Sequence, residues 1–93
     1  MFTQVLKQMR GSVRAGKMVM TTHALDEMDQ DDLVLADIEH AILKGDIITR
    51  QWDDKFSEWK YVIQGDDLDG NEIEVVAKPG QRSTVVIITV YRI

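Results

Sequence analysis

Apolar residues near the start of the chain recur with the spacing of an amphipathic helix. Positions i, i+3, i+4, i+7 and i+11 of this pattern are Phe2, Val5, Leu6, Met9 and Val13. These side chains fall on one face of a helix with about 3.6 residues per turn. The pattern predicts a helix that ends near Gly16, with Gly11 weakening its middle.

A second helix is expected after a short extended piece at residues 18–20. Thr21 or Thr22 can cap this helix, because a threonine hydroxyl accepts a hydrogen bond from a free N–H group of the first turn. The helix is predicted to run to about Met28.

The acidic run of residues 29–32 breaks the second helix and can cap a third one. The side chains predicted to face inward from this third helix are Leu35, Ile38, Ala41 and Ile42. Gly45 follows Lys44 and is expected to end the helix in the left-handed conformation that glycine adopts easily.

From Asp46 onward the apolar period changes to two, which indicates strands. The predicted strands are residues 47–52, 58–64, 73–78 and about 83–93. The turns between them are Asp53 to Lys55, Asp69-Gly70 and Pro79-Gly80. A proline followed by glycine favours a type II turn.

Helices first and a four-strand meander after them predict an α+β fold in a single domain of residues 1–93. The helical part, about residues 1–45, is expected to pack on one face of an antiparallel sheet made from about residues 46–93. This sheet has four strands, or five if the extended piece joins it.

The final strand, Val85 to Ile93, carries the most distinctive chemistry. Its apolar run VVIITV predicts burial on both faces. Thr89, Tyr91 and Arg92 stand at its exit, so a hydroxyl, a phenol and a guanidinium are held by a rigid element. This set suits a phosphate or nucleic-acid site.

The composition, with 44% apolar and 29% charged residues, is that of an ordinary globular domain. The sequence has no apolar run of about 18 residues to span a bilayer. Its first residues lack the apolar stretch and cleavage site of a signal peptide, so we expect a cytoplasmic protein without membrane contact. The absence of cysteine excludes disulfides, thiolate zinc sites and cysteine nucleophiles.

The net charge of −5 is unevenly distributed, with all sixteen acids between Asp26 and Glu74. The basic residues of the two acid-free ends are Lys7, Arg10, Arg14, Lys17, Lys78, Arg82 and Arg92. If the two ends meet in space, they form a basic surface suited to a phosphate backbone or an acidic partner. The alternative interpretation is that the first helix has only a solvated basic face.

Metal sites are not indicated. The sequence GDDLDGNE has alternating acids but lacks the twelfth-position glutamate of a calcium loop, so a plain hairpin turn is predicted. His23 and His40 belong to different predicted helices and have no third ligand at metal spacing.

Four motifs together resemble a bacterial protein family, the domain-of-unknown-function family numbered 4258. They are HALDEM at 23–28, DIEHAILKG at 37–45, Gly70 before a valine-rich strand, and IITVYR at 87–92. The resemblance covers about Met20 to Arg92. It implies kinship with the RelE, BrnT and MqsR class of compact ribonuclease toxins, and a small antitoxin protein and RNA as partners.

The resemblance implies metal-independent RNA cleavage, which requires a base, an acid and a cation on the phosphorane, with no cofactor. His23 is the candidate acid or base, because an imidazole exchanges protons near neutral pH. Arg92 could hold the phosphate in a bidentate contact. Tyr91 could donate a proton or stack on a base, and Lys60 could add positive charge.

Further substrate contacts are expected from Thr89 on the last strand and from Arg10 and Arg14 on the first helix. Many family members carry a histidine where this chain has Glu74, which could act as a base if buried but would repel RNA when ionised. The overall acidity also opposes RNA binding.

Each of these candidates also has a structural interpretation. His23 could be a half-buried residue bonded to a carbonyl, Tyr91 a core residue, and Arg92 the partner of an acid. The alternative function is therefore a non-catalytic module of the same fold that binds a protein or nucleic acid through its first helix.

Overall fold

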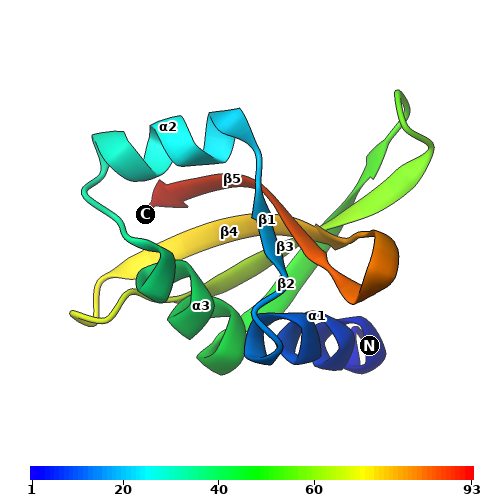
Figure 1. The fold of residues 1–93 in the computed structure, drawn as a ribbon, viewed down its shortest axis with the longest axis horizontal. Coiled ribbons are helices and arrows are strands. Elements are labelled where there is room, and N and C mark those ends of the chain that lie inside the picture. Colours follow the sequence, from blue (N-terminus) through cyan, green and yellow to red (C-terminus); the bar gives the residue numbers. More distant parts are fainter.

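The computed structural model describes residues 1–93 and arranges them as three helices and one five-stranded sheet (Figure 1). In chain order the elements are α1 (Thr3–Arg14), β1 (Met18–Met20), α2 (Thr22–Gln30), α3 (Leu35–Lys44), β2 (Asp46–Asp53), β3 (Glu58–Asp66), β4 (Glu72–Pro79), the 3₁₀ turn η1 (Gln81–Ser83) and β5 (Val85–Arg92). The predicted α+β class is confirmed, and all three helices precede the strands except for the short β1, which follows α1. None of the three helices combines the length and the apolar character needed to cross a membrane.

The strands lie in the order β1-β5-β4-β3-β2. Strands β2 to β5 pair antiparallel, as the meander predicted. β1 joins β5 in parallel, with Met18 opposite Val85 and Met20 opposite Ile87. The prediction of an antiparallel sheet is therefore wrong, because the sheet is mixed. A period-two pattern does not encode the direction of a three-residue strand, so the sequence could not reveal this pairing.

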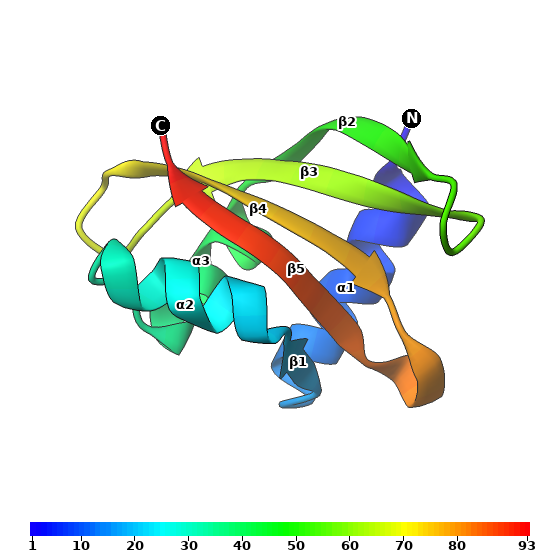
Figure 2. The same ribbon diagram turned by 90° about the horizontal axis from the view of Figure 1, so that it is seen from above.

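The three helices cover one face of the sheet, as Figure 2 shows. The largest fully buried side chains of the core between them are Met9, Ile38, Ile42, Ile63, Ile73, Ile87, Val75, Val85 and Val90. On β5, Val85, Ile87 and Val90 enter this core, whereas Tyr91 and Arg92 are exposed. The burial predicted for the run VVIITV on both faces therefore holds for one face only, since Val86, Ile88 and Thr89 are half-buried.

The start of α2 follows the capping rule, whereas α3 begins without a capping side chain. The hydroxyl of Thr21 accepts a hydrogen bond from the N–H group of Ala24 at 3.1 Å, so the predicted threonine cap is confirmed. The same hydroxyl donates to the carbonyl of Ile88 in β5 at 2.9 Å. The prediction that the acidic run of residues 29–32 caps α3 is wrong, because the N-cap is Val34, whose N–H group donates to Asp37 Oδ2 at 2.9 Å.

The predicted stop of the first helix is confirmed, since α1 ends at Arg14 and Gly16 follows with a φ of 72°. The predicted inner face of α3 holds for three of its four residues. Ile38, Ala41 and Ile42 are buried, but Leu35 at the helix start is 49% exposed.

Two glycine predictions are wrong. Gly45 is extended, with a φ of −87°, rather than left-handed. A Cβ atom there would lie 2.4 Å from the carbonyl oxygen of Gln64, so the close approach of α3 to β3 requires the glycine. Gly80 has a φ of −110°, which excludes the predicted type II turn, and the left-handed residues are Arg82 and Ser83 in η1.

Candidate active site along the last strand

Helix α2 presents a histidine and a glutamate one turn apart. His23 and Glu27 stand at i and i+4, so their side chains share one helix face. Nε2 of His23 lies 3.3 Å from Oε1 of Glu27. The histidine side chain is 70% exposed and the glutamate side chain 22% exposed. The carboxylate therefore orients an imidazole that solvent and substrate can reach, which suits a general acid or base.

Strand β5 fixes the position of Glu27. Oε1 of Glu27 accepts a hydrogen bond from the N–H group of Val90 at 3.0 Å and another from the hydroxyl of Thr89. The paired register of β1 and β5 ends at Ile87, so the strand edge beyond it has no strand partner. Helix α2 supplies the missing acceptor. Thr89, predicted to bind substrate, therefore serves here to hold Glu27.

Tyr91, Glu74 and Gln64 form a row across β5, β4 and β3, on the sheet face away from the helices. The Tyr91 hydroxyl donates to Glu74 Oε1 at 2.5 Å, and Gln64 Nε2 donates to Glu74 Oε2 at 3.4 Å. The hydrogen bond to Glu74 raises the pKa of Tyr91, and burial and the charges of Glu74 and Glu27 act in the same direction. The phenol therefore holds its proton more tightly than a free tyrosine and directs its O–H toward Glu74.

Arg92 is bound within the protein. Its Nη1 donates to Asp67 Oδ2 at 2.8 Å, while Nε and Nη2 donate to the carbonyl of Asp31 at 3.1 and 2.8 Å. Asp67 also accepts the N–H groups of Asp69 and Asn71. The hydrogen bond from Arg92, followed by those from the turn, lowers the pKa of Asp67 from 3.8 to about 2. The guanidinium thus ties the end of β5 to α2 and to the β3–β4 turn.

The structure does not bring Arg92 to His23. The carbonyl that Arg92 binds, that of Asp31, follows the last turn of α2, whereas His23 lies in the first turn. At 1.5 Å per residue the two positions are about 12 Å apart along the helix axis. Arg92 and Tyr91 also point to opposite faces of β5, because neighbouring strand residues alternate. One phosphate could not contact both Arg92 and His23 at their present positions.

Lys60 lies outside this cluster. It pairs with Asp53 at 3.8 Å and stands opposite Gln51 of β2. Along β3 it is about 13 Å from Gln64, the member of the Tyr91 row on that strand, at about 3.3 Å per residue. Its charge is therefore used in an ion pair within the β2–β3 hairpin.

The two arginines predicted on the first helix have different environments. Arg10 donates from Nε to the carbonyl of Ile42 at 3.0 Å and from Nη2 to that of Gly45 at 2.6 Å, so it caps the end of α3. Arg14 is exposed and lines a groove beside α1. Neither contacts the residues along β5.

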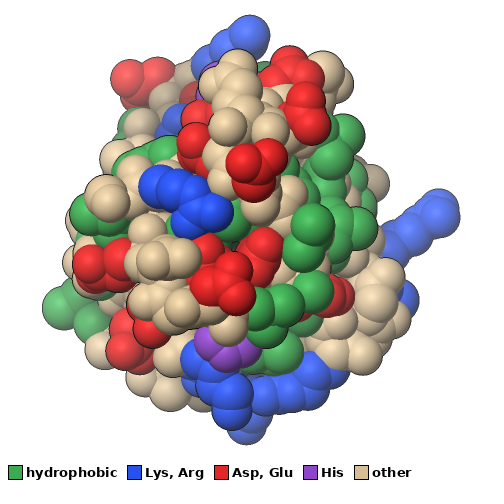
Figure 3. Space-filling model, turned by 90° about the vertical axis from the view of Figure 1, so that its left-hand side faces the viewer, with side chains coloured by type: hydrophobic (Ala, Val, Ile, Leu, Met, Phe, Trp, Pro, Cys, Tyr) green, Lys and Arg blue, Asp and Glu red, His purple; other side chains and the backbone are tan.

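The surroundings of the site are acidic. Figure 3, which looks at the end of the molecule with the β3–β4 turn, shows acidic side chains scattered over this face, with basic ones along its lower border and others at its centre, top and right margin. No group of three or more histidine, aspartate or glutamate side chains is placed to hold a metal ion. The imidazole of His23 and the phenol of Tyr91 are side chains near β5 that carry an exchangeable proton.

Two residues that matter here were not predicted from the sequence. Glu27 orients the imidazole, and its spacing of four residues from His23 on a predicted helix was the available signal. Asp67 anchors Arg92, but its partner lies on a distant strand, so no local pattern indicated the contact.

Comparison with known proteins gives a family and no closer relative. No curated protein and no solved structure matches the chain. The family described as "Domain of unknown function (DUF4258)" matches residues 20–92, which include every element from α2 to β5. The chain therefore belongs to the DUF4258 family.

Proposed function

We propose that the chain is a toxin-like, metal-independent ribonuclease, controlled by an antitoxin and acting in the cytoplasm. The observation that carries the proposal is the exposed imidazole of His23, oriented by Glu27 and supported by β5. The proposal includes kinship of fold and activity with the RelE, BrnT and MqsR class. The helices-first order and the meander support this kinship.

In the proposed reaction the 2′-oxygen of a ribose attacks the adjacent phosphorus while His23 takes the 2′-hydroxyl proton. The bond from phosphorus to the 5′-oxygen breaks, and the leaving oxygen receives a proton from Tyr91. The products are a 2′,3′-cyclic phosphate and a 5′-hydroxyl, and no electrons are transferred. One such acid or base contributes about 10²–10⁴-fold to a rate.

Arg92 has a positioning role in this proposal. Its guanidinium already binds Asp67 and the carbonyl of Asp31, so it holds the end of α2 on β5 and does not contact phosphate. Because Arg92 lies far from His23, the proposed mechanism differs from the one that the family resemblance implied, in which Arg92 holds the phosphate. Glu74 keeps the phenol protonated and does not act as the base.

The test is induced expression in growing bacteria, with growth and RNA integrity as readouts. The wild type should arrest growth and cleave RNA, whereas His23→Gln and Glu27→Gln should lose about 10²-fold or more of the cleavage. His40→Gln is the matched control, because it changes the other histidine, which lies on α3 beside Asp66. RNA cleavage that survives His23→Gln would remove the assigned role of the imidazole.

A second candidate function, a non-catalytic binding module, is favoured by the charges around the site. Three cations of the sheet, Arg92, Lys60 and Lys78, already bind acids of this chain, and the guanidinium of Arg50 lies over the ring of Trp59. Glu27 and Glu74 would repel a phosphate brought to His23. Intact RNA and equal growth in all strains of the expression test would favour this candidate.

A further inference from the structure

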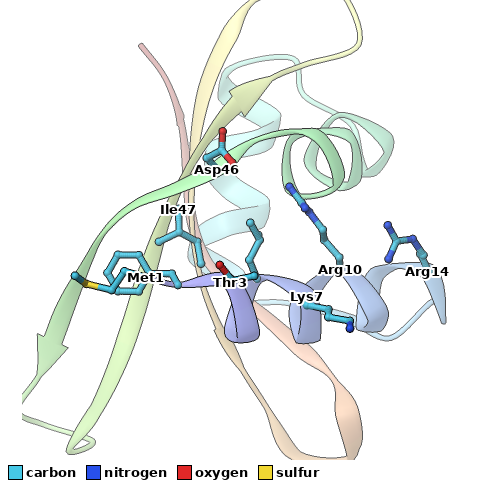
Figure 4. Close-up of a pocket in the computed structure, with 9 residues that line it drawn as sticks. Met1, Thr3, Lys7, Arg10, Arg14, Asp46 and Ile47 are labelled. Atoms are coloured by element: carbon cyan, nitrogen blue, oxygen red, sulfur yellow. The ribbon is translucent and has the colours of Figure 1, made fainter.

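A groove runs along α1 beside the start of β2, at the opposite edge of the sheet from β1. Its volume is about 720 Å³, within the range of pockets that accept a ligand or several side chains. The residues that line it are Met1, Phe2, Thr3, Leu6, Lys7, Arg10, Arg14, Asp46 and Ile47. Figure 4 shows Ile47 reaching from β2 toward α1, with the basic side chains spaced along the helix.

The inner wall of the groove is apolar. Leu6 is buried to 9% exposure, and Phe2 and Ile47 are half-buried beside it. Phe2 also packs edge-on against Tyr61 of β3, with ring centroids 6.0 Å apart. The wall therefore offers aliphatic and aromatic surface that an apolar side chain could cover.

The rim of the groove is basic. Lys7 and Arg14 stand seven residues apart on α1, hence on one helix face, and both are exposed. Neither makes an ion pair with this chain. Arg10 lies between them and donates only to neutral carbonyls, so its charge is not neutralised. Asp46 is the single acid in the lining, and three cations face it.

The groove itself offers one aromatic side chain, Phe2, and the tryptophans of the β2–β3 hairpin are not among the residues that line it. The guanidinium of Arg50 lies 3.8 Å from the ring centre of Trp59 and covers that face. Trp52 meets Trp59 edge to face, with ring centroids 5.0 Å apart. Binding of single-stranded nucleic acid requires exposed aromatic faces along a basic track. The apolar wall and basic rim instead complement a peptide that has acidic and apolar side chains.

We infer that the groove between α1 and β2 binds an acidic, amphipathic peptide segment of a partner protein. The apolar side chains of the segment cover Phe2, Leu6 and Ile47, and its carboxylates pair with Lys7, Arg10 and Arg14. This site shares no residue with the histidine site on β5, so the inference stands independently of the proposed ribonuclease.

The test is fluorescence anisotropy with the full chain and three labelled probes. The probes are a peptide of glutamate and leucine at amphipathic spacing, the same peptide with lysine in place of glutamate, and a uridine oligonucleotide. The glutamate peptide should bind, and its affinity should fall as salt rises. The double variant Lys7→Glu, Arg14→Glu should weaken this binding by about tenfold or more, since two favourable contacts become repulsive.

Two controls separate a groove from general electrostatics. The double variant Lys55→Glu, Arg82→Glu makes the same change in net charge on exposed residues outside the groove, and should keep the affinity within about twofold. Thr3→Glu adds a carboxylate at the first residue of α1, where negative charge favours the helix. It should weaken peptide binding several-fold without lowering the melting temperature.

Three results would overturn the inference. They are an absence of binding by the glutamate peptide, equal losses in the two double variants, and binding of the oligonucleotide in preference to the glutamate peptide.

Discussion

The two edges of the sheet differ in how their charged side chains are used. At the edge where α2 meets β5, Glu27 accepts hydrogen bonds from the strand, and Arg92 is bound to Asp67 and to α2. At the edge where α1 meets β2, Lys7 and Arg14 face solvent without an acidic partner.

This difference separates residues that hold the fold from residues that are available to a partner. Substitutions near β5 should change stability together with any activity, because the same side chains satisfy a sheet edge that lacks a strand. Substitutions on the outer face of α1 should change binding while the fold stays intact.

Asp67→Ala should be the most damaging change. It leaves the guanidinium of Arg92 without its acidic partner and removes the acceptor for Asp69 and Asn71 in the turn. We expect the melting temperature to fall by roughly 5–10 °C. Asp69→Ala, an exposed change in the same turn, should shift it by less than about 2 °C. Similar shifts for both variants would show that the network does not hold the fold.

Acid should remove the same contribution. The pKa of Asp67 is lowered from 3.8 to about 2, so its stabilising effect is fully present above the unfolded value and is lost as the pH falls through the folded value. In urea unfolding, the difference between wild type and Asp67→Asn should be constant from about pH 7 to 5 and shrink between about pH 4 and 2. A difference that does not change over this range would contradict the assignment.

Glu27→Ala should cost about 1–2 kcal/mol of unfolding free energy, because the Val90 N–H and the Thr89 hydroxyl lose their acceptor at the strand edge. Asp26→Ala changes a neighbouring, exposed acid on α2 and should cost less than about 0.5 kcal/mol. Urea unfolding of both variants measures the contrast, and equal costs would mean that α2 does not cover this edge.

Tyr91 gives a spectroscopic test with a smaller energetic effect. Its raised pKa means that the phenol contributes to stability below the ordinary value of 10.0, and that this contribution is lost as the pH rises through the higher folded value. In a Tyr61→Phe background, the tyrosinate absorbance should appear above pH 10.0. Adding Glu74→Gln should move the titration to lower pH, and no movement would exclude the hydrogen bond as its cause.

The variant Lys7→Glu, Arg14→Glu should have the smallest effect on the fold. Both side chains are exposed and unpaired, and the main cost is the carboxylate placed in the last turn of α1, so the unfolding free energy should fall by no more than about 1 kcal/mol. A loss several times larger would mean that these cations support α1, and would remove the distinction between the two edges.

Sequence patterns predicted much of the fold because local rules determine those parts. The helical spacing of apolar residues predicted α1, and threonine capping predicted the start of α2. The alternation of apolar and polar residues predicted the meander. The parallel pairing of β1 with β5 joins residues far apart in the chain, so no local pattern contained it. The predicted conformations of Gly45 and Gly80 were wrong for the same reason, because packing rather than local turn propensity determines the backbone conformation at these glycines.

The candidate site was predicted only in part. The sequence drew attention to His23, Tyr91 and Arg92, but their distribution over the two faces of β5 and the two ends of α2 depends on the three-dimensional packing. The interpretation of Arg92 as the partner of an acid, left open by the sequence, is the one that the structure shows.

The pairing of β1 with β5 affects when the site can exist during protein synthesis. A ribosome makes residues 18–20 early, and residues 85–87, their partners, only near the end of this sequence. The hydrogen bonds of Glu27 likewise cannot form until Thr89 and Val90 have been made. Contacts between such distant residues form late. A nascent chain in which β5 has not yet left the ribosome therefore lacks the oriented imidazole of His23. The proposed nuclease can act only after β5 has been translated.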